Sequence, residues 1–307
     1  MNLLERTVKI KIAYIISAYK LPNLLIRIVE RLQADNVVFF IHVDKKTSTA
    51  FFNDIKDRLG SYKNVNFLER HICNWGDFGH VKATLKGISA LLSQDIVFDY
   101  VILLTGQDYP IKSTEDINSF FLKNKGKSFM SFVRLPDKNW DVVDRLERRF
   151  FYLGALHVGL PLRIEGGRFA PLNPLKKFIN IFFPKRSFVS NMQPYGGLSY
   201  WALSNEAIRY VMNFLEAHPE YERFFKSTLI SDEFFFQTIL MNSPLKEEVV
   251  NNSYRYLIWY GKSRNPGVLT MADFSHLCSS DCLFARKFDP KVDEEILDMI
   301  DSVLLNK

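Results

Sequence analysis

Apolar positions along the first hundred residues follow the period of a strand in some segments and the period of a helix in others. Residues Val8 to Ser17 are mostly β-branched or apolar, which is typical of a strand buried on both faces of a parallel sheet. Residues 23–32 are apolar at helical spacing with charges on the other side, and residues 37–44 form another apolar run. A strand, a helix and a strand in this order predict a βαβ unit.

A second unit of the same kind follows the first. Residues 81–92 have helical periodicity, and residues 100–104 form a short strand-like run. Alternating strands and helices predict an α/β fold with a parallel sheet, whose ligand site lies at the carboxyl ends of the strands.

Beyond residue 127 the pattern is less regular. No stretch rich in Gly, Ser or Pro divides the chain, so we expect residues 1–307 to form one continuous domain. The segments predict, in order, a strand at 129–133, a basic helix or turn at 144–152, a loop-rich stretch at 160–190, helices at 205–215 and 231–240, a strand at 254–259 and a final helix at 293–305.

Composition narrows the class of protein. The 307 residues are 47% hydrophobic, which is enough for a sizeable core and excludes disorder for most of the chain. Lys and Arg exceed Asp and Glu by 40 to 34, and this modest excess suits an anionic small molecule or an anionic membrane surface. Acids and bases alternate along the chain, so we expect no nucleic-acid binding.

Cysteine usage and hydropathy bear on the compartment. Three cysteines without CxxC spacing indicate a reducing compartment and no structural zinc. The N-terminus shows no apolar export signal, and no run of about 18 apolar residues appears. We therefore expect a cytoplasmic protein, with peripheral contact on the inner face of the cytoplasmic membrane as a further hypothesis.

Acidic residues follow two of the predicted strands. Asp44 ends the strand at 37–44, and Asp108 follows the strand at 100–104. Each alone could be a solvated residue that opens a turn, but two at neighbouring strand ends indicate a binding site. No Gly-x-Gly-x-x-Gly, Walker loop or Asp-x-Asp follows a strand, so side-chain cations must neutralise any nucleotide diphosphate.

Five motifs occur in a fixed order along nearly the whole chain. They are Ile-Ala-Tyr-Ile-Ile at 12–16, Ile-His-Val-Asp-Lys-Lys at 41–46, Leu-Leu-Thr-Gly-Gln-Asp-Tyr-Pro-Ile-Lys-Ser at 103–113, Ser-Asp-Glu at 231–233 and Leu-Phe-Ala-Arg-Lys-Phe-Asp at 283–289. Together they resemble the core-2/I-branching N-acetylglucosaminyltransferase and peptide O-xylosyltransferase family, in a compact form of bacterial type.

The resemblance implies a GT-A type glycosyltransferase fold, a Rossmann-like mixed sheet flanked by helices. It places a nucleotide-binding half at about 8–130 and an acceptor and catalytic half at about 131–307. It further implies inverting transfer of a sugar, N-acetylglucosamine or xylose, from a UDP-sugar to a hydroxyl of a glycan or glycolipid acceptor in bacterial surface polysaccharide synthesis. Such a transfer uses neither a metal nor another cofactor, in agreement with the missing Asp-x-Asp.

The resemblance also assigns roles to single residues. Asp44 corresponds to the acid that contacts the uridine, Glu233 to the catalytic base and Lys287 to a lysine on the diphosphate. Arg264 falls where some members place a second phosphate-binding arginine. Many members have His at the position of Tyr19, so no donor contact is carried over there.

The chemistry of these residues suits the roles. Glu233 lies beside Asp232 and before three phenylalanines, which are surroundings that raise a carboxyl pKa, although an acidic helix cap is the alternative. Arg286 and Lys287 lie between apolar residues, either as basic tips of a segment anchored in the core or as a solvated pair. Asp108 completes the expected donor site.

Aromatic and basic residues indicate the acceptor site, because sugar rings stack on flat apolar faces while their hydroxyls need hydrogen bonds. Tyr200 and Trp201 end a Gly-rich segment, with an ordinary core role for Trp201 as the alternative. Arg145 belongs to a basic cluster at helical spacing, which fits a solvated helix face equally well.

Residues 174–186 suggest a separate contact. They mix apolar bulk with four cations, a composition typical of an interfacial membrane segment or of a helix packed on the core with solvated ends.

Two other functions remain open at this stage. A phosphatase or nucleotidyltransferase would use Asp44 and Asp108 with magnesium. An inactive protein would bind sugar nucleotides without transfer, which the presence of Glu233 and Lys287 disfavours.

Overall fold

Seven strands form the central sheet of the computed structural model, which describes residues 9–153, 156–162, 173–260 and 265–306. The strands are β1 (Ile12–Ala18), β2 (Val37–Val43), β3 (Val65–Phe67), β4 (Tyr100–Thr105), β6 (Ser128–Met130), β11 (Trp201–Ser204) and β12 (Val249–Asn251). Their order is β12-β6-β11-β4-β1-β2-β3. Strands β4, β1, β2 and β3 run parallel, whereas β11 is antiparallel to β4 and β6. The α/β fold is confirmed, with a mixed sheet.

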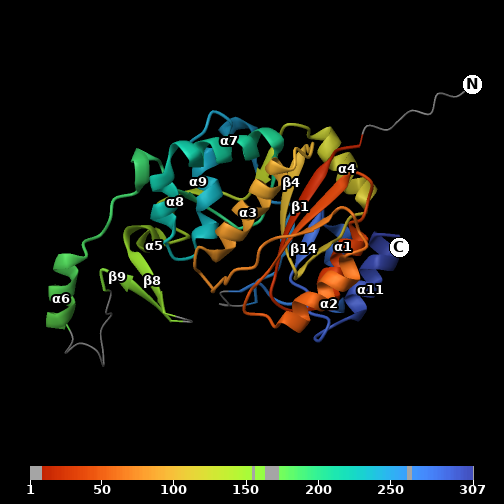
Figure 1. The fold of residues 1–307 in the computed structure, drawn as a ribbon, viewed down its shortest axis with the longest axis horizontal. Coiled ribbons are helices and arrows are strands. Elements are labelled where there is room, and N and C mark those ends of the chain that lie inside the picture. The colour runs from red at the N-terminus through yellow and green to blue at the C-terminus, as the bar shows by residue number, and fades with distance from the viewer. Residues whose placement is uncertain (1–8, 154–155, 163–172, 261–264, 307) are drawn as a thin grey trace, which may run out of the picture.

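Successive residues of β1 enter two different hydrophobic cores. Figure 1 shows β1 between helices such as α3 and α1. Tyr14 and Ile16 pack in one core, with the helices α1 (Pro22–Arg31), α2 (Thr49–Leu59), α4 (Thr114–Lys123), α10 (Phe274–Ser279) and α11 (Glu295–Met299). Ala13 and Ile15 pack in the other core, with α3 (Gly79–Ser93), α7 (Asn205–Ala217), α8 (Pro219–Phe225) and α9 (Phe235–Met241). This alternation explains why β1 is apolar at nearly every position.

Local sequence explains how helices start and how closely they pack. Helices α2, α4 and α7 each begin after a serine whose hydroxyl accepts a hydrogen bond from a backbone N–H of the first turn. The serine satisfies an N–H group that the helix itself leaves without a partner. In α3, a Cβ atom on Gly87 would lie 2.9 Å from the side chain of Ile15, so glycine permits the close approach of α3 to β1.

A second, three-stranded sheet continues from the carboxyl end of β4. Its order is β13-β14-β5, formed by β5 (Asp108–Pro110), β13 (Arg255–Leu257) and β14 (Phe284–Arg286). Strand β5 is antiparallel to β14, and Asp108 is the register partner of Arg286. The topology therefore joins two separate sequence motifs at the sheet edge where the ligand site is expected.

Smaller elements lie between the strands β6 and β11. They are β7 (Val133–Arg134), α5 (Val143–Glu147), β8 (Arg149–Leu153), β9 (Leu156–Leu160), α6 (Asn173–Phe182) and β10 (Tyr195–Gly196). The predicted helix or turn at 144–152 is thus a short helix followed by a strand. The prediction of a loop-rich stretch at 160–190 is wrong where α6 forms. Pro174 lies in the first turn of this helix, where a missing N–H costs no hydrogen bond.

Several other elements differ from the prediction at their ends. The strand expected at 129–133 is divided into β6 and β7, and the strand expected at 254–259 is the shorter β13. The helix expected at 231–240 begins later, because a 3-10 turn (Ser231–Glu233) precedes α9, and the last helix continues from α11 into a π-helical turn (Ile300–Leu304). Among the described residues, no helix combines the length and the apolar content needed to cross a bilayer.

Candidate functional site

An acid and two arginines lie buried where β5, β13 and β14 meet. The side chains of Asp108, Arg255 and Arg286 are 0%, 1% and 16% exposed. Oδ1 of Asp108 lies 3.6 Å from Nη1 of Arg286 and 3.9 Å from Nη1 of Arg255. Its Oδ2 accepts a hydrogen bond of 2.5 Å from the backbone N–H of Thr105. One carboxylate is thus shared by two guanidinium groups.

This cluster carries more positive than negative charge. Nε and Nη1 of Arg255 and Nε of Arg286 are buried without a hydrogen-bond partner, as is Oδ1 of Asp108. The centroid of the Tyr200 ring lies 5.0 Å from the guanidinium of Arg286 and 5.4 Å from that of Arg255, and such contacts stabilise desolvated cations. Burial lowers the pKa of Arg255, an effect that Asp108 opposes. An anionic ligand would neutralise the remaining positive charge.

Lys287 adds a partly exposed cation next to this cluster. Burial and the positive charges of Arg286 and Lys20 lower the pKa of Lys287. Lys20 itself pairs with Asp289, with Nζ 3.6 Å from Oδ2. Cations from two distant segments therefore gather at one edge of the sheet, where they suit a ligand with several negative charges.

Asp44 lies directly after β2 and is 4% exposed. Its Oδ1 accepts a hydrogen bond of 2.8 Å from the backbone N–H of Lys46, and its Oδ2 lies 3.5 Å from Nζ of the same lysine. The backbone N–H of Asp44 donates to the carbonyl of Ala18, the last residue of β1. The carboxylate thus opens a turn and is also fixed at the carboxyl ends of two parallel strands.

Glu233 ends the 3-10 turn before α9, and no side chain caps this helix. Nη1 of Arg145 donates a hydrogen bond of 2.8 Å to Oε2 of Glu233, and the two side chains are 26% and 27% exposed. Burial and the negative charge of Asp232 raise the pKa of Glu233 to about 7, although Arg145 opposes the shift. A carboxylate with this pKa accepts protons near neutral pH, as a general base must.

A short segment before β11 joins Glu233 to the arginine cluster. The backbone N–H of Gly197 donates to the carbonyl of Glu233 at 2.8 Å, and the hydroxyl of Ser199 donates to Oδ2 of Asp232 at 2.7 Å. The next residue, Tyr200, carries the ring that contacts both arginines. The fold therefore brings the candidate base and the candidate cations to the same segment.

One predicted site residue of the described part of the chain, Trp201, does not join this arrangement. Trp201 is 1% exposed, and its ring packs 5.0 Å from the ring of Phe236. The assignment of Trp201 to the acceptor site is therefore wrong. Strand β11 lies between β6 and β4 and is buried at every position, so the Trp201 ring offers no face to an acceptor. Arg264 lies outside the described residues.

Arg255 is the site residue that the sequence analysis missed. It lies in the strand predicted at 254–259, between Tyr254 and Tyr256. A lone cation within an otherwise apolar and aromatic strand is the signal that could have found it, because a buried charge needs a partner.

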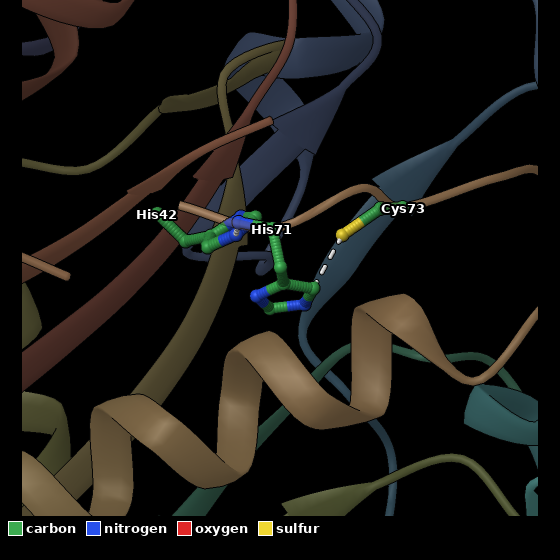
Figure 2. A group of neighbouring side chains, drawn as sticks. All are labelled: His42, His71 and Cys73. Carbon is green, nitrogen blue, oxygen red and sulfur yellow. Dashed lines mark hydrogen bonds between the residues drawn. The ribbon is translucent and has the colours of Figure 1, made fainter. Parts of the chain in front are cut away.

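His42, His71 and Cys73 form a second group of candidate ligands, with ligand atoms within 4.8 Å of one another (Figure 2). Nε2 of His71 faces Sγ of Cys73 at 3.6 Å and donates to the carbonyl of Gly79 at 2.9 Å. Nε2 of His42 accepts a bond from the backbone N–H of His71. Burial raises the pKa of the Cys73 thiol to about 12 and lowers the pKa of His42 to about 3. The Nε2 atoms of both histidines are thus engaged in hydrogen bonds, whereas their Nδ1 atoms are buried without a hydrogen-bond partner within the described ranges. We assign no role to this group.

Comparison with known proteins gives relatives along the whole chain. Over 318 residues the chain is 25% identical to xylosyltransferase 2 of Rattus norvegicus, a match that covers 95% of this chain and 33% of that protein. It is 24% identical over 323 residues to beta-1,3-galactosyl-O-glycosyl-glycoprotein beta-1,6-N-acetylglucosaminyltransferase 4 of Danio rerio, covering 96% of this chain and 70% of that protein. The chain spans about a third of the length of the xylosyltransferases that it matches.

Among solved structures, the galactosyltransferase LgtC in complex with donor and acceptor sugar analogues is similar over 95% of both chains, with a TM-score of 0.40 and 9% identity. The family model of the Core-2/I-Branching enzyme matches residues 12–278, which is well over half of the chain. The matched range contains Asp44, Asp108, Arg255 and Glu233 and ends shortly before β14. The chain therefore belongs to the Core-2/I-branching enzyme family.

Proposed function

We propose that this chain is an inverting, metal-independent glycosyltransferase of GT-A type, which moves a sugar from a UDP-sugar to a hydroxyl of a glycan acceptor. N-acetylglucosamine and xylose are the candidate sugars, as the names of the similar proteins suggest. The acceptor that we propose belongs to a bacterial surface polysaccharide.

One observation carries the proposal. The partly buried carboxylate of Glu233 and the excess positive charge of Arg255 and Arg286 are linked by a single short segment, through Gly197 at one end and Tyr200 at the other. An inverting transfer needs a base for the acceptor hydroxyl and cations for the leaving diphosphate, on opposite sides of the sugar that moves.

The proposed reaction uses these groups in one step. Glu233 takes the proton of the acceptor hydroxyl while the hydroxyl oxygen bonds to the anomeric carbon. The bond between that carbon and the β-phosphate oxygen breaks, and UDP leaves with the electron pair. Arg286 and Lys287 stabilise the leaving charge, which is larger in the transition state than in the ground state. Asp44 binds the uridine at the end of β2.

The surroundings of Asp108 support a transfer without a metal. One of its oxygens accepts the N–H of Thr105, and the other faces Arg255 and Arg286. A phosphatase or nucleotidyltransferase based on Asp44 and Asp108 would need both carboxylates as ligands of magnesium. The pairing of Asp108 with two arginines favours cationic side chains over magnesium in this role.

The acceptor side of the site is assigned to Arg145. Its guanidinium holds Glu233 and is 26% exposed, so it has donors left for acceptor oxygens. We assign Tyr200 to the donor side, because its ring contacts the two arginines. Trp201 is omitted, since it is buried.

The test is UDP release from a panel of UDP-sugars, measured with EDTA and with magnesium, together with binding of each UDP-sugar. We expect one UDP-sugar to bind and turn over in EDTA. Glu233→Gln should keep donor binding and lose about 100-fold or more in turnover, because the base is gone. Glu247→Gln, at an acid that is 84% exposed, is the matched control and should behave as wild type. A strict need for magnesium, or full turnover by Glu233→Gln, would refute the mechanism.

A further inference from the structure

Helix α6 presents large apolar side chains to solvent. Phe178, Ile181 and Phe182 are 61%, 72% and 66% exposed, and Phe183 after the helix is 38% exposed. Residues at i, i+3 and i+4 share one face of a helix, and the rings of Phe178 and Phe182 lie 5.2 Å apart. Figure 1 shows α6 apart from the sheet and from the helices that cover it. An apolar face of this kind on a helix indicates a contact surface.

The opposite face of α6 bonds to the chain itself. Oδ1 of Asn180 accepts a hydrogen bond of 2.6 Å from the backbone N–H of Leu162, and Nδ2 of Asn180 donates to the carbonyl of Leu162 at 3.1 Å. A polar side chain thus attaches the helix, and the apolar side chains are left without a partner in the described part of the chain.

The sequence around α6 is basic and contains no acid. Between Gly166 and Asn205 there is neither Asp nor Glu, whereas there are five cations, Arg168, Lys176, Lys177, Lys185 and Arg186. Lys185 pairs with Glu147, and the Arg186 guanidinium bonds to carbonyls of the chain. A contact with an anionic surface would therefore rely on Lys176 and Lys177 within α6. Exposed aromatic and aliphatic side chains on a helix that carries cations and no acid match an anionic bilayer, because the rings enter the headgroup boundary while the cations attract lipid phosphates. A partner protein with an apolar groove could bind the apolar face whether or not acids lay nearby. The absence of acids therefore favours an anionic bilayer.

The segment that follows α6 is fixed to the helix that carries a partner of the candidate base. The Arg186 side chain donates to the carbonyl of Leu146 at 2.8 Å, and its backbone N–H donates to the carbonyl of Glu147 at 2.9 Å. Both acceptors belong to α5, the helix that carries Arg145, whose guanidinium bonds Glu233. The chain that leads from α6 is therefore tied to the acceptor side of the proposed site.

We infer that α6 docks this chain on an anionic lipid bilayer and that the acceptor glycan is carried by a lipid of that bilayer. The second part rests on the proposed transferase function. Docking lays the apolar face of α6 in the headgroup region and brings the lipid-borne hydroxyl to Glu233 within the plane of the membrane, which raises its local concentration.

Sedimentation with vesicles tests the docking. The full chain is mixed with vesicles of phosphatidylglycerol and phosphatidylcholine, or of phosphatidylcholine alone, at low and high salt. We expect the triple variant Phe178→Ser, Ile181→Ser, Phe182→Ser to need at least about tenfold more anionic lipid than wild type for half sedimentation. Wild-type binding should also weaken with salt. Val303→Ser, a 50% exposed valine in the turn after α11, is the matched control and should bind as wild type.

Three outcomes would overturn the docking. The first is no sedimentation of wild type at low salt. The second is equal sedimentation of wild type and the triple variant. The third is a concentration-dependent dimer that the triple variant abolishes without any binding to vesicles, since this would make α6 an interface between two copies of the chain. All substituted side chains are exposed, so the variants should fold, and thermal unfolding checks this.

Activity separates the two proposals. Turnover of the donor without vesicles should be the same in wild type and in the triple variant, whereas transfer to an acceptor lipid in vesicles should fall at least about tenfold. Equal transfer to the vesicle-borne acceptor would overturn the inferred lipid carrier. If Glu233→Gln keeps full turnover while sedimentation still depends on α6, the transferase proposal fails and the docking stands.

Discussion

The contact between Arg145 and Glu233 gives the sharpest test of the proposed base. Arg145→Gln removes the positive charge and keeps a side chain that can donate a hydrogen bond. The guanidinium lies 2.8 Å from the Glu233 carboxylate and favours its charged form. Without it, the pKa of Glu233 should rise above its value of about 7.

The size of the shift follows from the distance and the exposure. An opposite charge this close lowers a carboxyl pKa by about 1–3 pH units. Both side chains are about a quarter exposed, so solvent screening favours the lower end, about one unit. A base acts only when ionised. At about pH 6, a rise of one unit in the pKa of Glu233 therefore lowers its ionised fraction, and the rate, about tenfold. At about pH 10, Glu233 is ionised in both wild type and Arg145→Gln, so this effect should not separate their rates.

The assay is the pH profile of kcat/KM, which reports the pKa of groups in the free enzyme. The rate should increase with pH through about 7 in wild type, and the acidic limb should move up by about one unit in Arg145→Gln. Asp232→Asn should move the limb in the opposite direction, because the charge of Asp232 raises the pKa. A variant that only binds its substrate more weakly has a lower kcat/KM at every pH, but the acidic limb of its pH profile stays at the same pH. Limbs that coincide in all three proteins would refute the role of Glu233 as the base.

Two further predictions concern the cation cluster. Asp108→Asn leaves two buried guanidinium groups without their counter-charge and should lower the free energy of unfolding by about 3–5 kcal/mol in urea titrations. Asp289→Asn removes the charge that pairs with Lys20 and keeps an oxygen for the backbone N–H of Lys291, so it should cost less than about 1 kcal/mol. Equal losses in the two variants would contradict the shared-carboxylate argument. Lys287→Ala should weaken UDP binding about 10–100-fold in calorimetry and reduce its salt dependence, while Lys291→Ala, at an exposed lysine, should bind UDP as wild type does. Unchanged UDP affinity in Lys287→Ala would remove it from the donor site.

Elements with strong local patterns were predictable. The apolar runs of β1, β2 and β4 and the helical spacing of α1, α3 and α7 appear in the structure close to their predicted positions. The sequence of β1 indicates a core on each face of the sheet, because a strand that contacts helices on both sides must be apolar at consecutive positions. Short elements such as β8, β9 and β13 were less well defined, since a few residues do not establish a period.

The sequence by itself determined the α/β fold class, the acids at the ends of β2 and β4 and the family to which the chain belongs. These features depend on local periodicity and on the order of motifs. Only the tertiary structure decided which charges meet: Arg145 with Glu233, and Arg255 and Arg286 on Asp108. It also decided that Trp201 is buried and that the apolar face of α6 is open. Burial and ion pairing depend on segments that are distant in sequence, so they follow from how the chain packs and not from any local pattern.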